Sequence, residues 1–373
     1  MDAICVNHSP DADYADAARL WQGIPGITRA PKGRLWATWY SGGKGEGPYN
    51  YVVLVTSGDD GRTWSAPQLV VHPPAPVRAY DPCLWTDPLG RVWLFWAQSY
   101  TKWDGRGGVW AIVASNPDAD KPEWSKPRRI ANGVMMNKPT VLKSGEWLLP
   151  VAVWARPSEM LAQNKVHQLN LTEGDFKAFS HHLPEEHGSA VWVSADRGET
   201  WTLRGKAGVP DSDFDEHMVV ERRDGSLWML ARTRFGIGET ASADGGRTWA
   251  PWSDTGIPHP VTRFFIRRLA SGSLLMVRHH SMAGKVRSHL AAYVSEDDGK
   301  TWRGGLMLDE RTSVSYPDGV QGPDGRIYVI YDRERSGAKE ILMAVFREED
   351  AAKGEWVSAD ARQKQLVSKG GAQ

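Results

Sequence analysis

The chain has 373 residues, and its 45 Lys and Arg are balanced by 45 Asp and Glu, so its formal net charge is zero. This balance argues against a nucleic-acid partner, because a basic surface supplies most of the affinity for a phosphate backbone. The two cysteines, Cys5 and Cys83, form neither a disulfide framework nor a metal-ligand pattern. No apolar run approaches the roughly 20 residues of a membrane-spanning helix. Residues 1–13 lack the basic and apolar regions of a secretion signal, so we expect none there, and we expect no membrane span, metal or cofactor.

Six segments pair a turn glycine with a run of aliphatic and aromatic residues, which is the sequence signal of a β-hairpin. They are residues 31–36, 88–93, 143–148, 224–228, 271–275 and 324–328. Six hairpins at nearly regular spacing predict an all-β fold, a six-bladed β-propeller with four-stranded antiparallel blades. The longest spacing, 80 positions between Gly145 and Gly225, predicts a polar and partly helical insertion into the third blade around residues 156–186. We expect residues 1–373 to form one propeller domain.

An eight-residue pattern, S-x-D-x-G-x-T-W, occurs four times without a mismatch and follows four of these hairpins. The copies are residues 57–64, 194–201, 242–249 and 295–302, and residues 115–124 hold a degenerate fifth copy. Asp, Ser and Thr side chains can bond the backbone of a tight turn, with the tryptophan packed beneath it. We therefore expect a structural role, and no chemistry, for Asp59, Asp196, Asp244 and Asp297.

Ligands of propellers usually meet the loops and strand starts around the central axis, so the candidate functional residues are charged groups early in each blade. Asp81 precedes the second hairpin, Glu216 and His217 precede the fourth, and Tyr316 precedes the sixth. Arg232 ends the strand after the fourth hairpin, and Arg287 begins the run that leads to the last eight-residue pattern.

Together these patterns resemble the sialidase (neuraminidase) superfamily, whose aspartate boxes have this eight-residue form. The resemblance extends from about Leu20 to about Phe346 and is carried by four segments. They are residues 216–232, Arg287-Ser288-His289-Leu290, Ser315-Tyr316-Pro317-Asp318 and Tyr80-Asp81-Pro82. In the first segment, Glu216 and Arg232 are sixteen positions apart.

The resemblance implies a retaining exo-glycosidase that removes a terminal acidic sugar, a sialic acid or a related ulosonic acid, from a glycan. Tyr316 would be the nucleophile and Glu216 its base, because a neutral tyrosine is not repelled by the carboxylate on the anomeric carbon. Asp81 would protonate the leaving oxygen and then activate water. Arg232 and Arg287 would hold the carboxylate through bidentate hydrogen bonds.

One position departs from the family. Sialidases begin with Phe/Tyr-Arg-Ile-Pro, whose arginine is the first of three that bind the substrate carboxylate, whereas this chain has Gly23 before Ile24 and Pro25. A charge-assisted hydrogen bond contributes roughly 1.5–3 kcal/mol, so the loss of this arginine should weaken binding of the substrate carboxylate. Either another arginine substitutes or the substrate differs from sialic acid. The candidate substitutes are Arg78, Arg263 and Arg267.

Two other functions stay open from sequence alone. The pocket could belong to a propeller rhamnosidase or lyase acting on uronic-acid-containing polysaccharides, since a uronate carries its carboxylate elsewhere on the ring. It could also belong to a non-catalytic glycan-binding propeller, since fold does not fix function.

Each candidate residue also has a structural alternative. Asp81 could cap a turn, Glu216 and Arg232 could form an ion pair between strands, and Tyr316 could be a core aromatic residue. Three further polar residues early in their blades could line the pocket, and His217 is counted among the candidate substrate-binding residues, although a hydrogen bond to a turn or a neighbouring blade is the more common fate of such groups. They are Asn137, Lys138 and His217.

Overall fold

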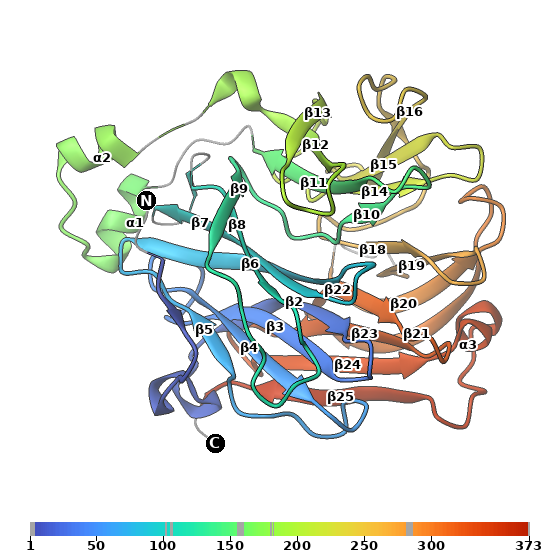
Figure 1. Ribbon diagram of the computed structural model, residues 1–373, viewed down its shortest axis with the longest axis horizontal. Helices are drawn as coiled ribbons and strands as arrows, with labels where there is room; N and C mark the ends of the chain where they lie inside the picture. The colour runs from blue at the N-terminus through green and yellow to red at the C-terminus, as the bar shows by residue number, and fades with distance from the viewer. Residues whose placement is uncertain are drawn as a thin grey trace.

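The computed structural model describes residues 4–100, 103–104, 107–154, 160–179, 181, 183–280 and 286–371. Its strands form six separate antiparallel sheets that follow one another around a ring (Figure 1). The predicted six-bladed β-propeller is therefore confirmed. Five sheets have four strands, and the first has a fifth, β1, on its outer edge.

The blades follow chain order, with the innermost strand first. Blade 1 contains β2 (Gln22–Arg29), β3 (Leu35–Ser41), β4 (Tyr51–Ser57) and β5 (Leu69–Val71), with β1 (Val6–Asn7) added outside. Blade 2 contains β6 (Val77–Thr86), β7 (Val92–Tyr100), β8 (Val109–Ala114) and β9 (Arg128–Ala131). Blade 3 contains β10 (Thr140–Val141), β11 (Trp147–Val153), β12 (Gly188–Ser194) and β13 (Thr202–Ala207).

The second half of the ring repeats this order. Blade 4 contains β14 (Met218–Glu221), β15 (Leu227–Arg232), β16 (Ile237–Ser242) and β17 (Ser253–Asp254). Blade 5 contains β18 (Phe265–Arg268), β19 (Leu274–His279), β20 (Ser288–Ser295) and β21 (Arg303–Thr312). Blade 6 contains β22 (Val314–Gln321), β23 (Ile327–Arg333), β24 (Glu340–Phe346) and β25 (Arg362–Lys369).

The hydrophobic core lies between neighbouring blades rather than at one centre. One buried cluster joins Ala37 and Val53 of blade 1 to Ile330 and Met343 of blade 6, which closes the ring. Other clusters join blades 2 and 3, 3 and 4, 4 and 5, and 5 and 6 in the same way. A sheet must bury its apolar faces against another element, and in a ring each blade covers the next.

The four exact aspartate boxes connect the third and fourth strands of their blades, and each forms the hydrogen bonds predicted for it. In the first box the Ser57 hydroxyl donates to Asp59 Oδ1 (2.7 Å) and the Gly61 N–H donates to Ser57 Oγ (2.8 Å). The Thr63 hydroxyl donates to Asp59 Oδ2 (2.7 Å). The same three bonds recur around Asp196, Asp244 and Asp297. These carboxylates are thus used within their own turns.

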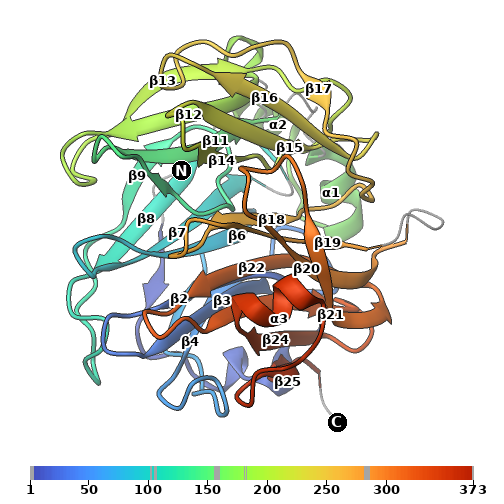
Figure 2. The same ribbon diagram turned by 90° about the vertical axis from the view of Figure 1, so that its right-hand side faces the viewer.

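Helices play a minor part in the fold. Between β11 and β12 lie α1 (Met160–His167), α2 (Glu173–Phe179) and the short 3-10 helix η3 (Pro184–Glu186), with α1 and α2 protruding beyond the sheets in Figure 1. The 3-10 helices η1 (Ala12–Tyr14) and η2 (Asp16–Ala18) precede β2. Helix α3 (Glu348–Lys353) lies beside β21 (Figure 2). Within the described residues, no helix is long and apolar enough to cross a membrane.

Candidate functional site

A cavity of about 290 Å³ lies where the innermost strands begin, and all six blades contribute to it. Its lining combines acidic, basic and aromatic side chains. Blades 1 to 3 supply Ile24, Tyr40, Glu46, Arg78, Asp81, Trp103, Met136 and Trp154. Blades 4 to 6 supply Phe214, Glu216, Arg232, Arg287, Tyr316 and Arg335. Six of the eight site residues predicted from sequence line this one cavity: Asp81, Glu216, Tyr316, Arg232, Arg287 and Arg78.

Tyr316, Glu216 and Arg232, together called the Tyr316 cluster, meet in the wall of the cavity. The Tyr316 hydroxyl donates to Glu216 Oε1 at 2.6 Å, and Arg232 Nη1 donates to the same Glu216 oxygen at 2.7 Å and to Tyr316 Oη at 2.9 Å. All three side chains are buried. Burial, and next the Glu216 carboxylate, raise the pKa of Tyr316 above its ordinary value, so the phenol is neutral at physiological pH. This is a phenol with a proton acceptor already in hydrogen-bond contact.

Asp81 faces the same cavity as a buried carboxyl group. Its Oδ1 has no hydrogen-bond partner among the described residues, and only 4% of the residue is exposed. Burial raises the pKa of Asp81 to about 8; Arg78 opposes this shift, and Glu46 and Glu216 add to it. A carboxyl group that keeps its proton at neutral pH can act as a general acid.

Four cavity residues share an unusual backbone conformation. Ile24, Asp81, Glu216 and Tyr316 have φ values of 57°, 46°, 43° and 54°, in the left-handed region that non-glycine residues rarely adopt. Ile24, Asp81 and Tyr316 each precede a proline, and each lies where the innermost strand shifts register against the next strand. A β-bulge of this kind redirects a side chain, and strain of this kind concentrates at functional sites. The repeat thus turns the same position of three blades toward the axis.

Arginine side chains surround Tyr316. The guanidinium carbon of Arg335 lies 4.3 Å from the centroid of the Tyr316 ring, and that of Arg287 lies 5.6 Å from it. Arg287 Nη2 also donates to the Val261 carbonyl at 3.1 Å. Sequence reasoning missed Arg335, which lies in the β23–β24 turn, because no motif marks that turn.

Two other lining residues have different surroundings. Arg78 stacks on Tyr80, with its guanidinium carbon 3.8 Å from the ring centroid, and its Nη1 donates to Asn50 Oδ1 at 3.1 Å. Glu46, in the β3–β4 loop, lies with one carboxylate oxygen 3.6 Å from Arg335 Nη1. Sequence reasoning also missed Glu46, since that loop has no regular pattern.

Aromatic rings form another side of the cavity. Trp103 and Trp154 have ring centroids 4.8 Å apart, and Trp154 meets Phe214 edge to face at 4.8 Å. The Arg232 guanidinium carbon lies 5.3 Å from the Phe214 ring centroid. Such a wall offers apolar contact beside a charged region, which suits a sugar ring or an apolar substituent on it.

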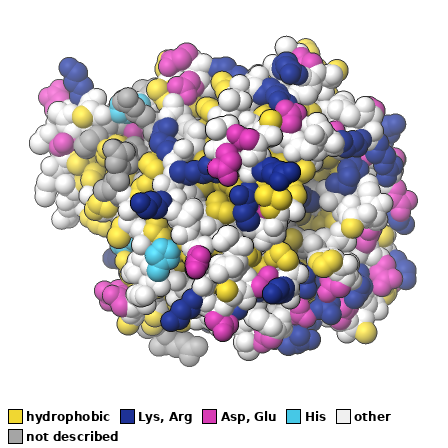
Figure 3. Space-filling view, viewed as in Figure 1, with side chains coloured by type: hydrophobic (Ala, Val, Ile, Leu, Met, Phe, Trp, Pro, Cys, Tyr) yellow, Lys and Arg dark blue, Asp and Glu magenta, His cyan; other side chains and the backbone are white. Residues whose placement is uncertain are grey.

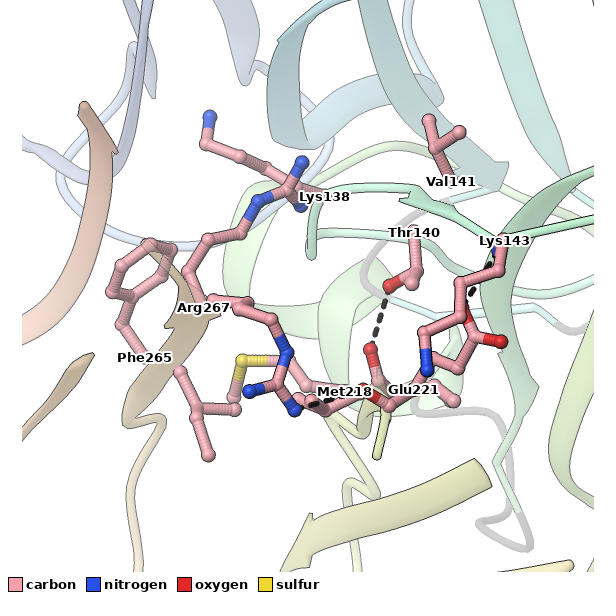
Figure 4. Close-up of a pocket in the computed structure, with 12 residues that line it drawn as sticks. Lys138, Thr140, Val141, Lys143, Met218, Glu221, Phe265 and Arg267 are labelled. Carbon is pink, nitrogen blue, oxygen red and sulfur yellow. Dashed lines mark hydrogen bonds between the residues drawn. The ribbon is translucent and has the colours of Figure 1, made fainter. Parts of the chain in front are cut away.

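Two residues predicted to bind substrate do not line this cavity. The imidazole of His217 lies 2.9 Å from the Ala190 carbonyl, and burial lowers its pKa to about 4. Arg267 Nη1 donates to the Pro139 carbonyl at 2.7 Å. Arg267 lines a separate cavity of about 270 Å³, between β10, β14 and β18 (Figure 4). Neither residue touches the Tyr316 cluster in this structure.

Three further polar residues join blades around the axis instead of lining the cavity. Asn137 Nδ2 donates to the carbonyls of Glu216 (2.8 Å) and His217 (3.0 Å), and Arg263 Nε donates to Asn137 Oδ1 (2.7 Å). Lys138 Nζ lies 2.8 Å from Asp318 Oδ2. Asn137 and Lys138 thus contact neighbouring blades, which is the common fate of such polar residues, and Arg263 does not reach the Tyr316 cluster.

The described residues contain no group of three or more His, Cys, Asp or Glu arranged to hold a metal ion.

On the face drawn in Figure 3, Lys and Arg side chains gather near the middle, with hydrophobic side chains between them. The Tyr316 cavity holds a phenol–carboxylate pair, a protonated carboxyl group and several guanidinium groups.

Fold and cavity together define a class: a six-bladed propeller with a buried tyrosine–glutamate pair and an arginine cluster at one end of its axis. Residues 33–329 match the model of the BNR repeat-like domain. The chain belongs to this family, and the resemblance to the sialidase superfamily is confirmed.

Known proteins resemble the chain over most of its length. A sialidase from Micromonospora viridifaciens is 26% identical over an alignment of 334 residues, which covers 83% of this chain and 49% of that protein. The chain thus spans about half the length of this curated relative. The Hadza microbial sialidase Hz136 superposes with a TM-score of 0.67 at 17% identity, over 90% of this chain and 67% of its own. The intramolecular trans-sialidase from Ruminococcus gnavus, solved with oseltamivir carboxylate, superposes with a TM-score of 0.66 at 14% identity, over 93% of this chain and 98% of its own.

Proposed function

We propose that this protein is a retaining exo-glycosidase that removes a terminal acidic sugar, a sialic acid or a related ulosonic acid, from glycans. The observation that carries the proposal is the Tyr316 hydroxyl 2.6 Å from Glu216 Oε1 and 2.9 Å from Arg232 Nη1 inside a cavity that also holds Asp81. The named sialidases among its relatives support the same reading.

In the first step, Tyr316 Oη attacks the anomeric carbon and the bond to the leaving oxygen breaks. The phenol proton passes to Glu216, and the Asp81 proton passes to the leaving oxygen. The product is a glycosyl–tyrosine bond and a free alcohol. Because the phenol is neutral before the attack, the substrate carboxylate does not repel it.

In the second step, water attacks the same carbon from the side that the leaving group has vacated. Asp81, now a carboxylate, takes a proton from the water, while Glu216 returns its proton to Tyr316 Oη as the glycosyl–tyrosine bond breaks. Two inversions give net retention of configuration, and every group returns to its starting protonation state. Arg232 and Arg287 hold the carboxylate in both steps.

The test is turnover of a fluorogenic N-acetylneuraminic acid glycoside by the parent and by Tyr316→Phe. The phenylalanine variant keeps the ring but has no nucleophilic oxygen, so we expect kcat/KM to fall at least about 1000-fold. Tyr293→Phe is the matched control, because Tyr293 is a buried tyrosine on β20 outside the cavity. We expect it to retain the parent's rate.

Unchanged turnover in Tyr316→Phe would contradict the proposed mechanism. A parent that cleaves no ulosonic acid glycoside, but forms a product absorbing in the near ultraviolet from a uronic-acid-containing polysaccharide, would instead be a lyase. A parent that binds glycans without any turnover would be a glycan-binding propeller.

A further inference from the structure

Gly23 lies at the position where the sialidase resemblance predicts an arginine, and another arginine fills the space beside it. A Cβ atom placed on Gly23 would lie 2.6 Å from Arg335 Cδ and 2.8 Å from both Arg335 Cγ and Nε. Real Cβ contacts do not come this close, so any side chain at position 23 and the present Arg335 side chain exclude one another. The space beside Gly23 is therefore occupied by the Arg335 side chain.

Arg335 is held by a built set of partners. Its Nε donates to Asp332 Oδ2 at 2.9 Å, and its Nη2 donates to Ser315 Oγ at 3.3 Å. Asp332 is fully buried, and its Oδ2 also accepts the Ile24 N–H at 2.8 Å. The Arg335 carbonyl accepts the Gln22 N–H at 3.2 Å. These contacts connect the β23–β24 turn of blade 6 to the first strand of blade 1 and fix the direction of the guanidinium group.

The charges in the cavity favour an anionic ligand. Its lining has four arginines, Arg78, Arg232, Arg287 and Arg335, and three acids, Glu46, Asp81 and Glu216. Because burial raises the pKa of Asp81 to about 8, this acid is mainly neutral at pH 7. Four positive charges then face two negative ones in the lining and Asp332 behind Arg335, which leaves an excess of one positive charge that a carboxylate would offset.

The geometry points to Arg335 as the third arginine of a carboxylate-binding cluster with Arg232 and Arg287, which Gly23 makes possible by leaving room for its side chain. Arg232 Nη1 touches Tyr316 Oη, and the guanidinium carbons of Arg335 and Arg287 lie 4.3 and 5.6 Å from the Tyr316 ring centroid. This inference rests on the proposed function. It adds that the third arginine comes from blade 6, as Arg335, instead of from position 23 of blade 1.

The experiment measures binding and so does not depend on turnover. The probes are 2,3-didehydro-2-deoxy-N-acetylneuraminic acid and its methyl ester, which differ only in the carboxylate, and the readout is the Kd from isothermal titration. The variants are Arg335→Ala, Gly23→Ala and the double variant. Arg333→Ala is the matched control, because Arg333 is a neighbouring arginine that pairs with Glu340 outside the cavity.

We expect Arg335→Ala to weaken binding of the free acid roughly 10- to 100-fold, the cost of one charge-assisted hydrogen-bonded contact, and to leave the ester unaffected. Gly23→Ala should also weaken binding of the free acid, because the alanine methyl group displaces the Arg335 side chain. In the Arg335→Ala background the same glycine change should have little effect, a non-additivity that a general loss of folding would not produce.

Free-acid binding by Arg335→Ala equal to that of the parent would overturn the inference while leaving the proposed function intact. Additive effects of the two substitutions would overturn the role given to Gly23. Preferential binding of the acid that depends on Arg335, in a protein with no glycosidase turnover, would refute the proposed function and uphold the inference. A parent that binds acid and ester equally would contradict both.

Discussion

Burial decides the protonation of Asp81, and with it the part that this residue can play. The carboxyl group lies among Arg78, Glu46 and Glu216, and the loss of solvent outweighs the favourable charge of the arginine, so its pKa rises to about 8. Glu216, which accepts hydrogen bonds from both Tyr316 and Arg232, has a different environment. Two carboxyl groups in one cavity can thus take the acid and base roles of the proposed reaction.

The raised pKa predicts a pH-dependent stability that Asp81→Asn removes. An unfolded aspartate loses its proton near pH 4, whereas the folded protein keeps this one up to about pH 8. The folded state therefore binds more protons between these values, and the free energy of unfolding falls as pH rises, by at most about 1.4 kcal/mol per pH unit. The contribution is complete below pH 4 and lost above pH 8.

Urea denaturation of the parent and Asp81→Asn at pH 6.5, 7, 7.5 and 8 measures this slope. The pKa of Asp215, raised by burial to about 6, and that of His217, about 4, lie below this window and are common to both proteins. We expect the asparagine variant to gain stability relative to the parent as pH rises. Parallel curves would show that Asp81 is ionised in the folded protein.

At the scale of strands, the sequence predicted the architecture because its signals are local. A turn glycine and the β-rich run after it lie within a few residues, and the bonds of an aspartate box close within eight, so both can be read without a structure. Two separate motifs, residues 216–232 and 315–318, marked Tyr316, Glu216 and Arg232 as candidates for one site. What the motifs could not show was the register shift of the innermost strand at Asp81 and at Tyr316, which directs these two side chains.

Strand geometry also explains the predicted residues that lie elsewhere. His217 directly follows Glu216, whose φ of 43° turns the backbone at this point, and the His217 ring meets the Ala190 carbonyl of blade 3 instead of the cavity. Arg267 is the third residue of β18, beyond the start of the innermost strand where the cavity lies, and it lines the second cavity. Arg335 and Glu46 are in loops, where position depends on contacts between blades 1 and 6 that no local pattern encodes.

At the scale of the whole molecule, one buried lysine joins blades around the axis. Lys138 Nζ lies 2.8 Å from Asp318 Oδ2 of blade 6 and donates to the carbonyls of Ile27 (2.5 Å) and Leu84 (2.6 Å) in blades 1 and 2. Asp318 Oδ2 also accepts the Ile27 N–H at 2.8 Å. Lys138 precedes β10 of blade 3, so a single side chain links four blades.

Removal of this lysine should destabilise the ring. In Lys138→Met the Asp318 carboxylate and two carbonyl groups lose a buried partner, and we expect a loss of roughly 3 kcal/mol in the free energy of unfolding. Lys32→Met, at an exposed lysine, should stay within roughly 0.5 kcal/mol of the parent. Urea unfolding gives both values. A Lys138→Met protein as stable as the Lys32→Met control would show that the contacts around the axis do not hold the blades together.

The central claim is that Tyr316 attacks the anomeric carbon of an acidic sugar, and covalent trapping tests it most directly. A 2,3-difluoro sialic acid has fluoride as its leaving group, and its second fluorine slows hydrolysis of the glycosyl–enzyme bond. Trypsin would then release residues 312–326, in which Tyr316 is the only tyrosine. Mass spectrometry should find this peptide heavier by one fluorosialyl group attached to Tyr316. Turnover of a sialoside with the label on another residue, or with no labelled peptide, would contradict the account.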